Sequence, residues 1–122
     1  MKYLRWYFVT TVLLFGGFAA AYGQTFFTAH LTGAQENPAV ETDASGTGYF
    51  VLGDEGLHYH ITAEGLEVTA AHFHRAEIGR NGGVVRNLNF NGMKTTSGLW
   101  NPDDDAQSLT DELIQDLFAG RL

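Results

Sequence analysis

Residues 46–62 read GTGYFVLGDEGLHYHIT and contain the strongest fold signal in the chain. The segment 46–52 is rich in aromatic and β-branched residues, which favour strands, and the segment 53–56 is a hairpin-length turn with glycine at both ends. The next six residues alternate, with Leu57, Tyr59 and Ile61 on one face and His58, His60 and Thr62 on the other. A period of two is typical of a half-buried strand, so the stretch predicts an antiparallel hairpin.

The same period of two extends outward from this hairpin. Phe27, Ala29 and Leu31 alternate with polar residues and predict a strand, and the polar segment 34–45 that follows is expected to be a loop. Three further strands are expected at 68–78, 84–90 and 95–100, with a glycine-containing turn at 80–83. Short antiparallel strands joined by such turns are typical of a β-sandwich or a barrel.

The pattern changes near the C-terminal end. Residues 103–105 are three aspartates, which we interpret as a solvated acidic turn. Beyond them, apolar residues recur at helical spacing: Leu109, Leu113, Ile114, Leu117 and Phe118. This spacing predicts one amphipathic helix over 109–119. Ser108 is the expected N-cap, with Asp111 three residues later in an approximate capping box, and Gly120 is the expected stop.

The composition limits both the size and the chemistry of the protein. A chain of 122 residues fits one small domain. The absence of cysteine excludes a disulfide scaffold, a thiolate metal site, a cysteine nucleophile and a lipid-anchored lipoprotein. Seven basic residues against 14 acidic ones give a formal charge of −7. This balance argues against nucleic acid as a partner, because such binding depends on Lys and Arg neutralising phosphates.

Residues 1–23 have the pattern of an export signal. Lys2 and Arg5 form a positive start, an uncharged apolar run follows, and the run turns to small residues before Gly23. We expect a signal peptide over 1–23, cleaved after Gly23, and a mature segment over 24–122 with 5 basic and 14 acidic residues, a formal charge of −9. The alternative is an uncleaved anchor helix, although the run is short for a bilayer span and no positive flank follows it. Cleavage would leave a periplasmic, cell-surface or secreted domain without a stable membrane span, and the compact leader favours a bacterial source.

Histidine supplies the clearest candidate for site chemistry. There are five histidines: His30, His58, His60, His72 and His74. Four of them form two His-x-His pairs, and residues i and i+2 of a strand project from the same face, about 7 Å apart. One such pair can hold a metal ion, and imidazole suits copper or zinc. His72 and His74 are the sharper pair of metal ligands, and His58 and His60 are the second.

Two ligands make a weak metal site, so further ones would have to come from His30, from Glu36, across the sheet or from another chain. The alternative interpretation is that the histidines are ordinary polar residues on strand faces. Nothing else in the chain assembles a catalytic set, because it has no Gly-x-Ser-x-Gly elbow and no phosphate-binding glycine loop. Glu36 and the aspartates at 103–105 are interpreted as solvated, and the tyrosines and tryptophans as strand and core residues. The residues therefore favour a non-enzymatic protein.

Several segments also follow one another in a specific order: 28–38 (TAHLTGAQENP), 46–50, 57–62, 65–66, 70–74 (AAHFH), 79–85 (GRNGGVV), 97–100 and 117–120. In this order and spacing they resemble the CHRD domain family, named for chordin and present in exported microbial proteins. The resemblance covers residues 26–122. It implies an all-β domain, an antiparallel β-sandwich of immunoglobulin-like or superoxide-dismutase-like shape, with one short C-terminal helix.

Two further points come from resemblance. The stretch 65–74 is similar to the copper-binding strand of copper/zinc superoxide dismutases, which implies His72 and His74 as core ligands with His58, His60 or His30 as helpers. The CHRD pattern usually continues after the helix with a histidine-bearing strand and one more strand. The resemblance therefore implies a domain over 24–122 that lacks its final strands, either by truncation or because another chain completes it.

These observations predict an exported CHRD-type domain that acts as a non-enzymatic binding or interaction module outside the cytoplasm. Its expected partner is an extracytoplasmic protein or a metal ion, and not nucleic acid. One alternative is a histidine-based copper or zinc binding domain with a superoxide-dismutase-like site. Another is a stabilising domain of surface assemblies that a partner strand completes.

Overall fold

The computed structural model describes residues 9–12 and 23–122. Its strands are β1 (Val9–Val12), β2 (Thr25–Thr32), β3 (Ser45–Gly53), β4 (Gly56–Glu64), β5 (Ala71–Arg75), β6 (Gly83–Leu88) and β7 (Thr95–Trp100). A 3₁₀ turn, η1 (Gly33–Gln35), follows β2, and one helix, α1 (Asp111–Phe118), follows β7. The leader predicted over 1–23 lies outside the described residues except for β1 and Gly23. No helix in the described ranges has both the length and the apolar character to cross a bilayer.

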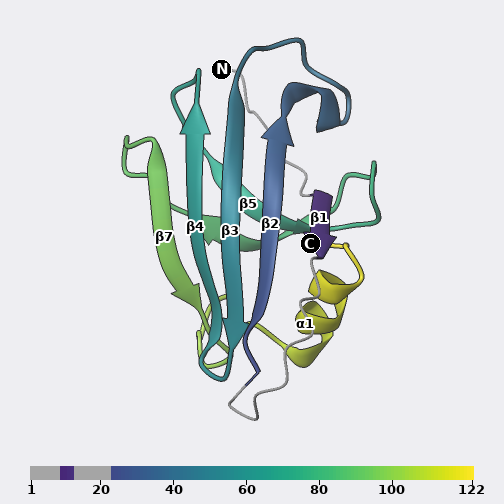
Figure 1. Ribbon diagram of the computed structural model, residues 1–122, viewed down its shortest axis with the longest axis vertical. Coiled ribbons are helices and arrows are strands. Elements are labelled where there is room, and N and C mark those ends of the chain that lie inside the picture. Colours follow the sequence, from purple (N-terminus) through teal and green to yellow (C-terminus); the bar gives the residue numbers. More distant parts are fainter. Residues whose placement is uncertain (1–8, 13–22) are drawn as a thin grey trace.

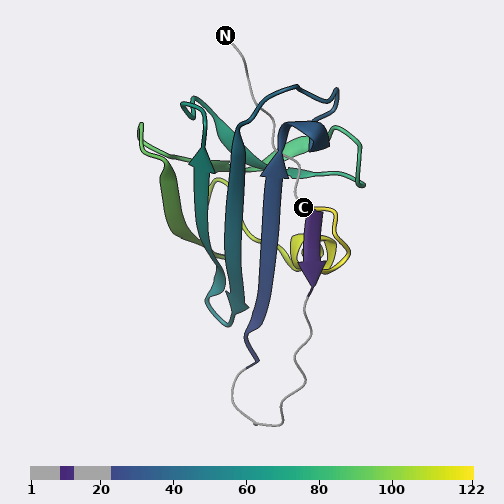
Figure 2. The same cartoon turned by 45° about the horizontal axis from the view of Figure 1, so that its top comes forward.

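The all-β class predicted from the sequence is confirmed. Five strands form one antiparallel sheet in the order β1-β2-β3-β4-β7, and β5 and β6 form a second, two-stranded antiparallel sheet. The second sheet crosses behind the first, and α1 lies beside β2 near the C-terminal end (Figure 1). The tilted view in Figure 2 shows the same arrangement, with the small sheet and the helix on one side of the large sheet. Among residues 9–12 and 23–122, one face of the large sheet is therefore covered and no element covers the other.

The hairpin that decides the fold forms as predicted. β3 and β4 pair over their whole length, from Ser45 opposite Glu64 to Gly53 opposite Gly56. Gly56 has a φ of 127°, and a Cβ there would collide with the carbonyl oxygen of Trp100. Only glycine therefore lets the chain turn at this point while β7 runs alongside.

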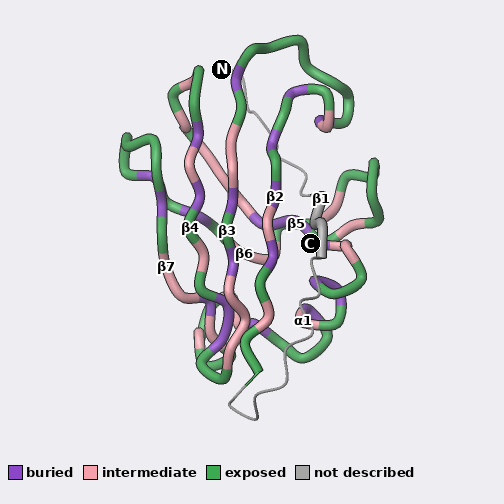
Figure 3. Tube along the Cα trace, in the orientation of Figure 1, coloured by how far each residue is buried: buried purple, intermediate pink, exposed green. Residues whose placement is uncertain are grey.

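The core lies between the two sheets. Buried and exposed positions alternate along β2 and β4, as Figure 3 shows, and the inward residues pack together from every layer. Phe73 of β5 is the central contact: its ring centroid lies 5.9 Å from that of Phe50, 5.8 Å from Tyr59 and 5.4 Å from Trp100. Trp100 is completely buried. The core is thus aromatic and joins the small sheet to the large one.

Two strands are shorter than predicted. The expected strand 68–78 is only β5, because the chain turns away after Arg75 into the loop that connects β5 to β6. Ile78, whose apolar side chain extended the prediction, lies on that loop and is 72% exposed. The expected strand 84–90 is β6, which ends at Leu88 because Asn89 caps the next turn through its side-chain oxygen, accepting from Asn91 N–H at 2.9 Å.

The helix forms, but its predicted N-cap is wrong. The structure begins α1 at Asp111, and Thr110 caps it by accepting a hydrogen bond from Leu113 N–H at 3.3 Å. Ser108 instead donates its hydroxyl to the carbonyl of Pro102. Leu109 enters the core before the helix begins, so it is 1% exposed without being helical. Gly120 follows the helix with a φ of 69°, in agreement with the predicted stop.

Candidate functional site

The two His-x-His pairs lie in different sheets. His58 and His60 are on β4 of the large sheet and are exposed, because Leu57 and Ile61 occupy the buried positions of the same strand. This outward placement confirms the expectation from the alternation. His72 and His74 are on β5 of the small sheet. The two pairs therefore have different surroundings.

His58 and His60 belong to a larger surface, which we call the outer face. Strand register aligns two neighbouring rows of outward side chains across β2, β3, β4 and β7. Residues directly opposite each other in antiparallel strands share a face, so the side chains of each row are neighbours. The first row is Phe26, Val51, His58 and Leu99, and the second row is Thr28, Tyr49, His60 and Ser97. This face is turned to the viewer in Figure 1.

The outer face is both aromatic and exposed. Phe26 is 60% exposed and Tyr49 is 58% exposed, and the two are diagonal neighbours on adjacent strands. A shallow hollow of about 410 Å³ lies over this face, and its lining includes Tyr49, Val51 and Ser97 together with both histidines. Exposed apolar groups gathered on one face indicate an interaction site more strongly than scattered ones do.

Polar contacts organise the hollow. His60 Nδ1 and Ser97 Oγ are hydrogen-bonded at 2.6 Å, which ties the imidazole of β4 to β7. At the rim, His58 Nε2 lies 3.8 Å from Glu55 Oε2, an exposed i,i+3 contact that contributes little to stability. His30 is also on the outward side of the sheet, opposite Thr47, one row beyond the outer face.

The second pair is partly enclosed. The ring centroids of His72 and His74 are 5.6 Å apart with perpendicular planes, so the two imidazoles lie against each other. His74 is 6% exposed, and its Nδ1–H donates to the carbonyl of Gly82 at 2.9 Å. A carbonyl can only accept, so Nδ1 of His74 is the donor in this bond, and the bond fixes the orientation of the ring.

The pairing of β5 with β6 is irregular where this histidine pair lies, because β6 has an extra residue, Val85. The register between β5 and β6 shifts between Phe73 and His74, which marks a β-bulge. Gly82 approaches so closely that a Cβ would collide with the carbonyl of Arg75. The bulge of β6 and the close approach of Gly82 together bring the Gly82 carbonyl to His74.

The additional ligands considered from the sequence do not join either pair. In the part of the chain that the structure describes, no three His, Cys, Asp or Glu side chains are grouped so that they could hold a metal ion. Glu36 follows η1 directly and is 7% exposed, so its interpretation as a solvated carboxylate is wrong. Its backbone N–H bonds the Gly33 carbonyl at 3.1 Å, and this 3₁₀ turn folds the residue inward.

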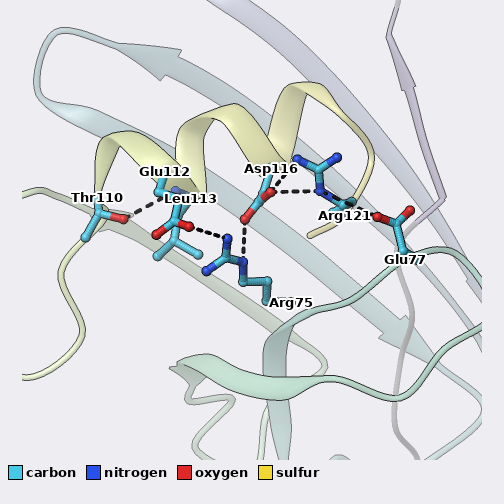
Figure 4. Close-up of polar contacts among 7 residues, drawn as sticks. All are labelled: Arg75, Glu77, Thr110, Glu112, Leu113, Asp116 and Arg121. Carbon is cyan, nitrogen blue, oxygen red and sulfur yellow. Dashed lines mark hydrogen bonds and ion pairs between the residues drawn. The ribbon is translucent and has the colours of Figure 1, made fainter.

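A charged cluster fixes β5 to α1, and sequence reasoning missed it. Asp116 of α1 is only 2% exposed. It forms one ion pair with Arg75 at 2.5 Å and a second with Arg121 at 2.7 Å (Figure 4). Arg75 directly follows His74 on β5. Arg75 also pairs with Glu112 at 2.7 Å, and Arg121 lies 3.9 Å from Glu77. The available signal was the position of Asp116 three residues after Leu113, because i,i+3 spacing places the acid beside the apolar face of the helix.

A second ion pair corrects the prediction for the acidic turn. Asp104 is partly buried and pairs with Arg86 of β6, whereas Asp103 and Asp105 are exposed as expected. The hydrogen bond from Arg86 lowers the pKa of the Asp104 carboxyl, and the backbone N–H groups of Gln107 and Ala106 lower it further. The acidic turn is therefore attached to the small sheet through one of its three carboxylates.

The aromatic part of the outer face was also missed. Trp100 is a core residue and Tyr49 is a strand residue, as predicted, but Tyr49 is mostly exposed and does not belong to the core. The signal was available in the alternation. If Phe27 and Phe50 point inward, then their neighbours Phe26 and Tyr49 must point outward.

Comparisons with known proteins give one result. The family model described as CHRD domain matches residues 27–122. Searches of curated proteins and of solved structures find no significant match. The matched range contains every described element except β1 and the first two residues of β2.

Proposed function

The chain belongs to the CHRD domain family, and on that basis we propose that it is an exported, non-enzymatic binding module that docks a partner on its outer face. The family supports a role in binding or interaction. Export is supported by the sequence of residues 1–23, with its positive start, apolar centre and small residues before Gly23. The partner is a component of the periplasm, cell surface or exterior, and not a nucleic acid.

The observation that carries this proposal is the exposure of Phe26 and Tyr49 side by side on the open side of the large sheet. Half-buried Val51 and Leu99 extend the apolar surface, and His58, His60 and Ser97 add hydrogen-bonding groups to it. An apolar centre with such groups around it is the anatomy of a binding surface.

Binding and export are tested separately. The purified protein is sedimented with cell-envelope fragments, and we expect the bound fraction to fall at least tenfold in the variant Tyr49→Ala. Ile78→Ala is the matched control, because Ile78 is also a large exposed hydrophobe but lies off the outer face. Equal sedimentation of the wild type and Tyr49→Ala would contradict docking on this face. For export, the N-terminus of the product released from expressing cells should be Gln24, and a product starting at residue 1 would contradict it.

A specific observation favours a second function, histidine-based binding of copper or zinc. His72 and His74 lie with ring centroids 5.6 Å apart, and the Gly82 carbonyl orients the His74 ring through Nδ1–H. Metal-ligating histidines commonly donate their other ring N–H to a carbonyl in this way. The pair would hold the ion through imidazole nitrogens, with the remaining positions filled by water or by a partner.

Calorimetry with Zn(II) and Cu(II) tests this second function. Stoichiometric binding with a dissociation constant tighter than about 1 µM is expected. The double variant His72→Ala/His74→Ala should abolish it, whereas His58→Ala/His60→Ala should leave it unchanged. Loss of binding in the second double variant instead would place the ion on the outer face, and weak binding by the wild type would exclude the function.

A further inference from the structure

We propose that the ligand of the outer face is a neutral saccharide, bound across Tyr49 and the histidine pair of β4. This inference rests on the docking role proposed above and names the chemistry of the partner. It depends on the charge, the shape and the hydrogen-bonding groups of the face.

The outer face carries no charged side chain when histidine is neutral. Its two rows hold only aromatic, aliphatic, hydroxyl and imidazole groups: Phe26, Val51, His58, Leu99, Thr28, Tyr49, His60 and Ser97. The chain around it has a formal charge of −7, which repels anionic polymers. A ligand that fits this surface is therefore uncharged and itself part apolar and part hydroxyl, which describes a neutral sugar ring.

The exposed aromatic rings supply the apolar half of the recognition. The face of an aromatic ring is electron-rich, and the C–H groups on one side of a pyranose ring are weakly positive, so sugars stack on such rings. Tyr49 stands between Thr28 on β2 and His60 on β4, with more than half of its surface open to solvent. Phe26 is its diagonal neighbour, so the two rings can contact successive sugar units.

The polar half comes from β4 and β7. A sugar hydroxyl both donates and accepts hydrogen bonds, and so do a serine hydroxyl and a neutral imidazole. Because His60 Nδ1 is engaged with Ser97 Oγ, the Nε2 edge of the ring is the one directed to a ligand. His58 lies on the same strand face two residues away and lines the same hollow. His58 and His60 therefore follow β4 alongside Tyr49, and Ser97 lies beyond His60 on β7.

The shape of the hollow agrees with this assignment. The hollow is open along the sheet, and neither the small sheet nor α1 covers this side (Figures 1 and 2). An open site on a sheet accepts a chain that continues past it at both ends, so an oligosaccharide fits better than an isolated monosaccharide.

The test is an NMR titration of the ¹⁵N-labelled full chain with cellohexaose, maltohexaose and chitohexaose, and with hexagalacturonate as the charged probe. At least one neutral probe should shift the amide signals of Tyr49, His58, His60 and Ser97 at probe concentrations of up to about 10 mM. Tyr49→Ala should weaken this binding at least tenfold, and Tyr49→Phe, which keeps the ring, should retain most of it. Ile78→Ala should bind as the wild type does.

Three results would overturn the saccharide assignment: none of the neutral probes shifts these signals, only hexagalacturonate does, or Tyr49→Ala and wild type respond alike. A thermal melt verifies that the variant is folded, and His60→Ala gives a second variant on the same face if it is not. If the probes fail while Tyr49→Ala still reduces sedimentation with envelope fragments, the face docks another kind of partner and only the ligand class is wrong. If sedimentation is also unchanged, the docking role itself is wrong.

Discussion

The segments His58-Tyr59-His60 and His72-Phe73-His74 have the same pattern and different surroundings. In both, the central aromatic ring enters the shared core, where Tyr59 and Phe73 are 5.8 Å apart between ring centroids. The histidines of β4 remain exposed on a regular strand. Beside β5, the partner strand β6 has a bulge at Val85, and His74 is 6% exposed and hydrogen-bonded to Gly82. The local pattern therefore sets the direction of the aromatic ring, whereas neighbouring elements set the environment of the histidines.

The cause is the number of layers around each strand. β4 lies inside the large sheet between β3 and β7, and its second face has no covering layer among the described residues. β5 belongs to a two-stranded sheet with α1 fastened to its end through Arg75 and Asp116. A histidine on β4 is thus exposed to solvent, while His74 on β5 is enclosed by the protein. Four predictions test this contrast.

The largest effect should come from the central aromatics. Phe73→Ala should lower the free energy of unfolding by about 3–5 kcal/mol, because the ring is 3% exposed and contacts Phe50, Tyr59 and Trp100. Tyr59→Ala should cost less, since that side chain is only half-buried. Urea unfolding followed by tryptophan fluorescence measures both, and a larger loss for Tyr59→Ala would contradict the central position of Phe73.

The second-largest effect should come from the charged cluster that fixes β5 to α1. Asp116→Ala should destabilise the protein by about 2 kcal/mol, less than for a fully buried pair, because the two guanidinium groups left behind reach solvent. Amide exchange should speed up in β5 more than in β4. Glu77→Ala is the control, because its contact with Arg121 spans 3.9 Å on the surface. An equal acceleration of amide exchange in β4 and β5 would show that the charged cluster does not stabilise β5 specifically.

Replacing a histidine of each pair by alanine should lower the free energy of unfolding by different amounts. His74→Ala should lower the free energy of unfolding by about 1–2 kcal/mol, because it removes a buried ring and leaves the Gly82 carbonyl without its donor. His60→Ala should stay within about 0.5 kcal/mol, because its bond to Ser97 is exposed and water can replace it. Chemical denaturation of the two variants side by side gives the difference, and equal losses would contradict the contrast between the pairs.

The sequence was sufficient for β2, β3, β4 and β7 of the large sheet, where an apolar alternation or an aromatic and β-branched run marks a strand, but β1 falls in the segment interpreted as an export signal and was not predicted as a strand. Leu57, Tyr59 and Ile61 predict both the strand and its buried face, and the structure agrees with them. β5 was less predictable. Its length depends on where Arg75 meets Asp116 of a helix more than 40 positions along the chain, and no local pattern encodes that contact.

The candidate site divides in the same way. The outward placement of His58 and His60 follows from the alternation of side chains along a strand. The same alternation would have placed Phe26 and Tyr49 outward too. The burial of His74 and Glu36 could not be read locally. One depends on a bulge and on Gly82, and the other depends on a 3₁₀ turn after β2. Sequence reasoning was thus reliable within a strand and failed where two elements meet.

The smallest effect concerns how the small sheet responds to acid. The pKa of the Asp104 carboxyl lies below its ordinary 3.8, first because Arg86 of β6 donates to it and then because of the Gln107 and Ala106 N–H groups. The folded state thus binds this proton less readily than the unfolded state. The stabilisation is fully present above pH 3.8 and is lost as the pH falls through the lowered folded value. In Asp104→Asn, stability should therefore fall less steeply with decreasing pH than in the wild type. The urea midpoint of unfolding, measured between about pH 5 and pH 2, gives this slope.

Asp103→Asn is the control, because Asp103 is exposed and should leave the slope unchanged. Parallel curves for the wild type and Asp104→Asn would show that the Arg86 pair does not contribute to folding. Because Arg86 is on β6, acid should also speed amide exchange in β5 and β6 before it reaches β3 and β4. The small sheet, which depends on ion pairs with the C-terminal segment, would then loosen while the hairpin that carries the outer face stays intact.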